Sequence, residues 1–129
     1  MATPSSLANT TWTGTIQGAN GNTYQFVLAF GSGPTNSTPG TGSITNPNDA
    51  SNGSNGITNP FEWGETEGNT GARLFVVSVS QWSPANGWWI GTAVPGTGAG
   101  QGTGSGYCLW NPSTQTQHML INFTMEQTS

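Results

Sequence analysis

Three carboxylates fall within six residues of this 129-residue chain, at Glu62, Glu65 and Glu67. If the segment is a β-strand, Glu65 and Glu67 share one face and Glu62 lies on the other, because strand side chains alternate. Two neighbouring carboxylates can act as general acid and base or bind Ca²⁺. The same residues can also form a solvated strand end, since they run into the turn-like sequence Glu-Gly-Asn-Thr-Gly, and we favour that interpretation.

An enzyme built on this chain would draw its acid or base from Glu62, Glu65, Tyr24, Tyr107 and His118. None of the serines stands in the G-x-S-x-G pattern of a nucleophile elbow. One histidine and one cysteine are too few for a metal site made of several such ligands. We therefore expect no metal and no cofactor, and we interpret His118 as a strand histidine whose polar tip is hydrogen-bonded.

The chain holds six tryptophans but no lysine, and Arg73 is its one arginine, for a net charge of -4. Nucleic acids and anionic membranes are bound by clusters of lysine and arginine. The composition therefore excludes nucleic acid as a partner and points to a neutral ligand.

Three of the tryptophans surround one turn signal, Asn86-Gly87. Trp82 precedes this turn, while Trp88 and Trp89 follow it and must point to opposite faces of a strand. A sugar can stack its apolar C–H face on an indole while amides and hydroxyls bind its hydroxyl groups. The predicted ligand-binding residues are Trp82, Trp88, Trp89, Asn86, Gln81 and Tyr107. The remaining tryptophans, Trp12, Trp63 and Trp110, are predicted to be core residues.

Apolar residues alternate with polar ones throughout the chain, which is the period of β-strands. Turn signals such as Asn20-Gly21 separate the alternating segments. The pattern predicts an all-β fold of about eight antiparallel strands, as a single small barrel or alternatively a β-sandwich. We favour the barrel because closure removes edge strands, which a chain without lysine cannot protect by charge. The predicted strands cover 10–17, 24–30, 41–45, 61–67, 73–82, 88–94, 106–110 and 117–126.

The length predicts one domain over residues 1–129, with a flexible loop rich in Gly, Ser, Asn and Pro at about 31–59. No apolar run approaches a membrane span. Met1 to Ser6 lack a basic segment followed by an apolar core, so we expect a cytoplasmic protein or the mature form of a secreted one. Cys108 has no cysteine partner and is expected to be a small buried residue.

The segment 73–82 is apolar on both faces where it begins. Leu74 and Val76 face one way, and Phe75, Val77 and Val79 face the other. A strand of this kind is covered on both sides. We therefore expect a neighbouring subunit on one side, and hence a homo-oligomer.

Residues along the chain resemble the calycin β-barrels, the superfamily of lipocalins and avidins. The sequence Thr11-Trp12-Thr13-Gly14 is similar to the Gly-Thr-Trp opening of those families. The later tryptophans, Trp82, Trp88 or Trp89 and Trp110, together with Phe123-Thr124 on the last strand, are similar to the avidin pattern. The first strand lacks the Trp-Tyr-Asn continuation of an avidin, and no lipocalin-like arginine lies near the last strand. The resemblance implies a barrel and a tendency to bind ligands, without biotin-binding residues.

Taken together, these features predict a small barrel that binds a neutral ligand without catalysis, with a carbohydrate favoured over an apolar small molecule. One alternative is a barrel enzyme of cyclase or isomerase type that shapes a hydrophobic substrate. Another is a structural or coat protein, in which the Gly/Thr/Asn loops are solvated rims.

Overall fold

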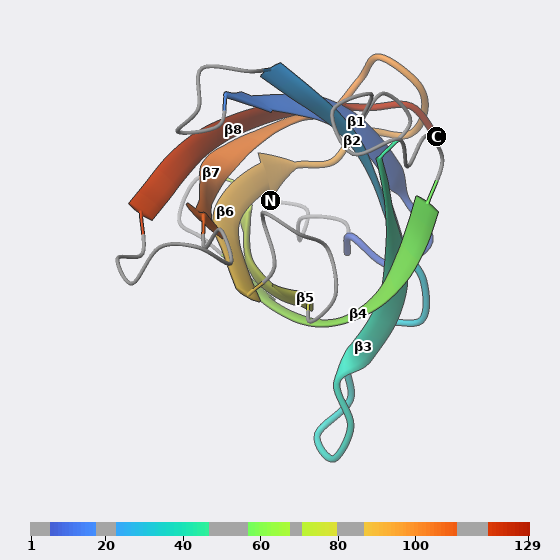
Figure 1. Cartoon of the computed structure of the whole chain (residues 1–129). Helices are drawn as coiled ribbons and strands as arrows, with labels where there is room; N and C mark the ends of the chain where they lie inside the picture. Colours follow the sequence, from blue (N-terminus) through green and yellow to red (C-terminus); the bar gives the residue numbers. More distant parts are fainter. Residues whose placement is uncertain (1–5, 18–22, 47–56, 68–70, 80–86, 111–118) are drawn as a thin grey trace.

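The computed structural model describes residues 6–17, 23–46, 57–67, 71–79, 87–110 and 119–129. Eight strands make up its regular structure, and Figure 1 shows them arranged around a ring. The described part of the chain contains no helix that is long and apolar enough to cross a membrane. The strands are β1 (Thr11–Gln17), β2 (Thr23–Phe30), β3 (Gly40–Asn46), β4 (Ile57–Glu67), β5 (Arg73–Val79), β6 (Gly87–Val94), β7 (Thr103–Trp110) and β8 (Met119–Gln127).

Each strand pairs antiparallel with the next along the chain, and β1 pairs with β8 to close the barrel. The predicted all-β barrel is therefore confirmed, and the sandwich alternative is wrong. The strand bounds agree with the predicted ones within a few residues, except that β4 begins at Ile57, inside the segment predicted as a loop. Pro60 explains the difference, because proline normally argues against a strand, whereas here it lies exposed on β4 opposite Ser43.

The inward faces of the strands form one aromatic core. Phe26 packs against Trp89 with ring centroids 4.9 Å apart, and Phe30 packs against Trp63 at the same distance. Phe75 and Phe123, 6.3 Å apart, join these two groups. Most of these rings meet edge to face, the arrangement that aromatic quadrupoles favour. The fully buried Trp12 and the 3% exposed Trp63 confirm two of the predicted core tryptophans, whereas the side chain of Trp110 lies outside what the structure describes.

Glycines on the inward faces make room for these rings. A Cβ atom at Gly42 would overlap the ring of Phe61 directly across the β3–β4 pair. A Cβ at Gly14 would likewise overlap the ring of Phe26 across the β1–β2 pair. Small residues opposite large ones let a narrow barrel hold a filled interior, so the glycines of these strands are packing residues.

The chain closes one end of the barrel with the segment before β1. Leu7 is fully buried in the core, and Asn9 adopts a φ of 63°, a left-handed conformation that asparagine tolerates well. The hydroxyl of Thr10 accepts a hydrogen bond from Nε1 of Trp12 at 2.8 Å. This turn therefore carries an apolar side chain across the barrel mouth and leads into β1.

Candidate ligand-binding site

Four outward-facing side chains form a row across the outer wall of the barrel. Thr41 on β3 lies opposite Glu62 on β4, Glu62 lies opposite Ser78 on β5, and Ser78 lies opposite Trp88 on β6. Neighbouring strands are about 4.8 Å apart, so the row brings residues distant in sequence onto one continuous surface. It starts with a hydroxyl, passes a carboxylate and ends on an indole.

The connection between β2 and β3, residues 31–39, forms a wall beside this row. Its beginning is fixed to β3, since the Gly31 N–H donates to the carbonyl of Thr41 and the Thr41 N–H donates to that of Ser32. Within it, the Thr35 N–H donates to the carbonyl of Thr38 at 2.9 Å. In Figure 1 the connection projects away from the barrel at the start of β3. Part of this segment, predicted as the beginning of a flexible loop, is therefore a hydrogen-bonded turn.

This turn and the outer wall enclose a groove of about 510 Å³. On the barrel side its lining includes Glu62, Val76, Ser78 and Trp88, and on the turn side it runs from Pro34 to Pro39. A second hollow of about 450 Å³ lies beside it and shares Glu62 and Ser78 with it. The two hollows therefore meet at the middle of the row.

The indole of Trp88 is the largest exposed ring in the groove, with 55% of the residue accessible. Trp89, the next residue, is fully buried in the core, as expected from the predicted opposite orientation of the pair. Tyr107 is 50% exposed on the outer face of β7, opposite Ile90. Of the predicted ligand-binding residues, the structure therefore brings Trp88 to the groove and Tyr107 to the same outer face, and it places Trp89 inside.

Charge in the groove comes from Glu62, the one ionisable side chain among the described residues that line it. Glu62 is exposed and makes no hydrogen bond or ion pair with another described residue. The one arginine of the chain does not reach it, because Arg73 is bound elsewhere. The carboxylate of Glu62 is therefore available to a ligand.

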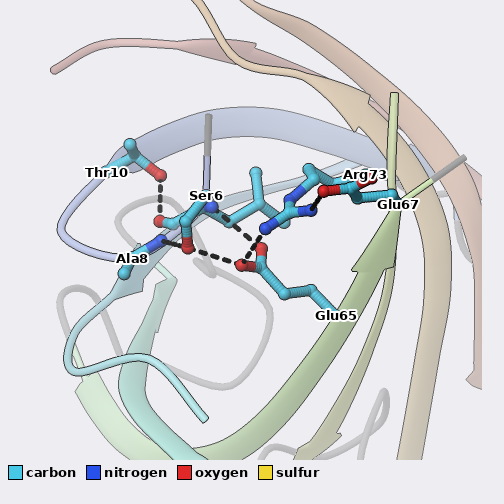
Figure 2. Close-up of polar contacts among 7 residues, drawn as sticks. Ser6, Ala8, Thr10, Glu65, Glu67 and Arg73 are labelled. Atoms are coloured by element: carbon cyan, nitrogen blue, oxygen red, sulfur yellow. Dashed lines mark hydrogen bonds and ion pairs between the residues drawn. The ribbon is translucent and has the colours of Figure 1, made fainter. Parts of the chain in front are cut away.

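Glu65 and Glu67 lie on the inward face of β4, opposite in orientation to Glu62. Arg73 Nη2 donates to Glu65 Oε1 at 2.9 Å, and Arg73 Nη1 lies 3.7 Å from Glu67 Oε1 (Figure 2). The second oxygen of Glu65 accepts the backbone N–H of Leu7 at 2.9 Å, and the hydroxyl of Ser6 donates to the first. Glu65 thus holds the segment before β1 across the barrel end, which is a structural task.

The residues predicted as acid or base do not converge in the described part of the structure. Glu62 and Glu65 face opposite sides of β4, and Tyr24 lies in the interior near the start of β2, far along the barrel from Glu65. Tyr107 is on the outer wall of β7. His118, Gln81, Trp82 and Asn86 lie outside the described residues. Among the described residues, no group of three or more His, Cys, Asp or Glu could hold a metal ion.

Burial also determines the protonation state of Cys108, which is fully buried on the inward face of β7. Loss of hydration raises the pKa of its thiol to about 12, partly opposed by a backbone hydrogen bond. A thiol that stays protonated is a poor nucleophile. Cys108 is the small buried residue that the sequence predicted.

The sequence did not indicate the wall of the groove. Residues 34–39 have the composition of a solvated loop, and the bracketing prolines, Pro34 and Pro39, are the one signal of a fixed turn. The pairing of β3 with β4 and of β4 with β5 then places Glu62 beside that turn. Register of this kind depends on contacts between distant segments, so it could not be read from local patterns.

In comparisons with family models, with curated proteins and with solved structures, no match to this chain was found. The closed eight-stranded antiparallel barrel agrees with the architecture that the resemblance to calycins implies. The barrel alone does not establish membership of that superfamily.

Proposed function

We propose that this protein binds a neutral carbohydrate without catalysis, on the outer wall of its barrel. The observation that carries the proposal is the half-exposed indole of Trp88 in a groove that also presents Glu62 and Ser78. An exposed indole beside polar groups fits a sugar ring, which has an apolar face and a polar rim. The aromatic rings of the interior are engaged with one another, which favours the outer wall over the lumen as the site.

An apolar small molecule is the second candidate, because Val76, Pro34 and Pro39 add apolar surface to the same groove. The two candidates differ in the use of Glu62, which a sugar hydroxyl can satisfy and an apolar ligand cannot. An apolar ligand would leave the carboxylate partly dehydrated without a hydrogen bond, and this is costly.

Tryptophan fluorescence distinguishes these candidates. We expect neutral sugars to shift the emission of the wild-type protein and to leave that of Trp88→Ala unchanged, because the other described tryptophans, Trp12, Trp63 and Trp89, are buried. A matched control is Leu120→Ala, which removes an exposed side chain of β8 that lies outside the groove. If no neutral sugar in the panel changes the emission of the wild-type protein, the carbohydrate proposal is wrong.

We also propose that copies of the chain associate through an outer apolar strip made of Leu74, Val76, Ile90 and Tyr107. These residues are each at least 37% exposed. Val76 lies opposite Ile90, and Ile90 lies opposite Tyr107, so the strip crosses three strands without interruption. Contiguous exposed apolar surface is a frequent mark of protein contacts, and several copies of one weak sugar site would raise the overall affinity.

A further inference from the structure

We infer that the site takes a neutral glycan of at least two linked sugar rings, lying across β6, β5, β4 and β3 with Glu62 at the junction of two subsites. The inference rests on the proposed carbohydrate binding at Trp88 and specifies the length of the ligand and the residues that select it.

The length follows from the two hollows. The first contains Trp88 and is bounded by the Pro34–Pro39 turn, and the second contains Thr41 and Pro60. Both include Glu62 and Ser78, so one surface runs continuously from β6 to β3. Three strand spacings of about 4.8 Å give this surface a width of about 14 Å. One pyranose ring cannot cover that width, whereas two or three linked rings can.

The subsites differ in what they offer a sugar. At Trp88 the indole can stack on the apolar face of one ring. At the far side, the exposed Thr41 and Pro60 present a hydroxyl and a small apolar surface to the next ring. A ligand ring on Trp88 therefore contributes the stacking, and the second ring extends the contact over Thr41.

Glu62 stands where both rings can reach it. Its carboxylate is an acceptor for several hydroxyl groups, and hydrogen bonds to an ionised acceptor are the stronger kind. Ser78, across the β4–β5 pair, adds a hydroxyl that donates and accepts. Among the described residues no arginine or lysine lines either hollow, so a uronic or sialic acid would bring a second negative charge next to Glu62. The site therefore selects neutral over anionic glycans.

Isothermal titration calorimetry tests the inference with gluco-, galacto- and manno-oligosaccharides of one, two and three rings. In at least one series we expect the two-ring sugar to bind about tenfold or more tightly than the one-ring sugar. Thr41→Met, which fills the second hollow, should reduce the affinity for two rings to that for one ring. Trp88→Ala should abolish binding of both.

Glu62→Gln should weaken binding of the two-ring sugar about tenfold and reduce the discrimination against the matching uronic acid. Glu126→Gln is the matched control, because Glu126 is an exposed carboxylate on β8 outside both hollows. Equal affinities for one and two rings, or a Thr41→Met variant with unchanged two-ring affinity, would overturn the inference and leave carbohydrate binding standing. Failure of every sugar to bind the wild type would overturn both.

Discussion

At the scale of single residues, Trp88 and Trp89 show how one step along a strand changes a side chain's surroundings. Trp88 is more than half exposed, while Trp89 is fully buried and packs against Phe26 and Phe123. Alternation alone predicted that the two side chains would lie on opposite faces of the strand, but it did not indicate which one would face outward. The inward phase of β6 is set by its register with β5, where Trp89 lies opposite the buried Val77.

The pair of Glu65 and Arg73 makes a testable contribution to stability. Their side chains are only 6% and 13% exposed, and Nε of Arg73 is buried without a hydrogen-bond partner among the described residues. Removing one partner of such a pair costs about 3–5 kcal/mol, because the other charge stays buried and uncompensated. We expect Arg73→Met to lower the free energy of unfolding by about 3 kcal/mol in urea titrations.

The double variant Glu65→Gln/Arg73→Met should recover part of that loss, because it leaves no buried charge and the amide can still accept the Leu7 N–H. Exposed Glu126→Gln serves as the control for loss of a carboxylate. A loss below about 1 kcal/mol for Arg73→Met would fit an exposed pair instead, and would contradict the packing described for this end of the barrel.

Cys108 gives the protein a predictable response to alkali. Burial raises the pKa of its thiol from the ordinary value of 9.0 to about 12 in the folded protein. Well below pH 9 the thiol is neutral in both states and contributes no pH dependence. As the pH rises from 9 toward 12, the unfolded chain releases this proton and the folded chain does not. The free energy of unfolding therefore falls by about 1.4 kcal/mol per pH unit across this window.

Cys108→Ala should lack this contribution. Urea titrations of wild type and variant at about pH 8, 9, 10 and 11 give the comparison, since every other titrating group is common to both proteins. Parallel pH profiles for the two proteins would show that the thiol is not held protonated by burial.

At the scale of elements, the pattern of alternating residues predicted the eight strands and which residues share a face of each strand. For the strand at 73–79 it left open which of two apolar faces lies inside, and the structure buries Phe75, Val77 and Val79 while it leaves Leu74 and Val76 exposed. On β2 the alternating residues Tyr24, Phe26, Leu28 and Phe30 form the buried face. What local pattern missed is the beginning of β4, because Ile57 to Pro60 has neither strong alternation nor a run of β-branched residues. That stretch is a strand because β3 pairs with it, from Asn46 opposite Ile57 to Ser43 opposite Pro60.

Two glycines of the barrel wall, Gly42 and Gly64, differ in the space available for a side chain. In Gly42→Ala the new Cβ would lie 2.5 Å from the ring of Phe61 and from the carbonyl oxygen of Ala29. Overpacking of this kind costs about 1–3 kcal/mol, and we expect that loss in the free energy of unfolding.

Gly64→Ala is the matched control on β4, because its new Cβ would meet nothing within 4 Å. We expect that variant to equal the wild type or to gain up to about 1 kcal/mol from reduced backbone entropy. Equal effects of the two substitutions would show that these glycines are not selected by ring packing.

At the scale of the whole molecule, the closed barrel explains how a chain with so few charged residues can protect its strands from edge-to-edge aggregation. Every strand is paired on both sides, so no sheet edge needs a charged residue to prevent aggregation. Among the described charged residues, Arg73 forms an ion pair with Glu65 at one end of the barrel, and Glu62 lines the groove on the outer wall without an ion-pair partner. Composition favours a neutral ligand, and this stays a prediction, whereas only the pairing of distant strands joins Trp88, Ser78 and Glu62 into one surface.

The outer apolar strip makes a prediction about assembly. We expect size-exclusion chromatography with light scattering to give a mass that is a multiple of 13.3 kDa. The double variant Leu74→Thr/Ile90→Thr should shift the mass toward the monomer, because it removes apolar surface and keeps residues that favour strands. Neither residue lines the groove, so sugar binding at a single site should persist in this variant. A wild-type protein that stays monomeric at high concentration would rule out the strip as an interface.

Carbohydrate binding at Trp88 is best tested with a glycan array probed in parallel with wild type and Trp88→Ala. We expect wild type to bind neutral glycans of two or more rings and to give weaker signals with anionic glycans. Trp88→Ala should lose the signals while its unfolding transition stays close to that of the wild type. Wild-type binding that survives in Trp88→Ala, or an array without any signal above background, would contradict a carbohydrate site on the outer wall of this barrel.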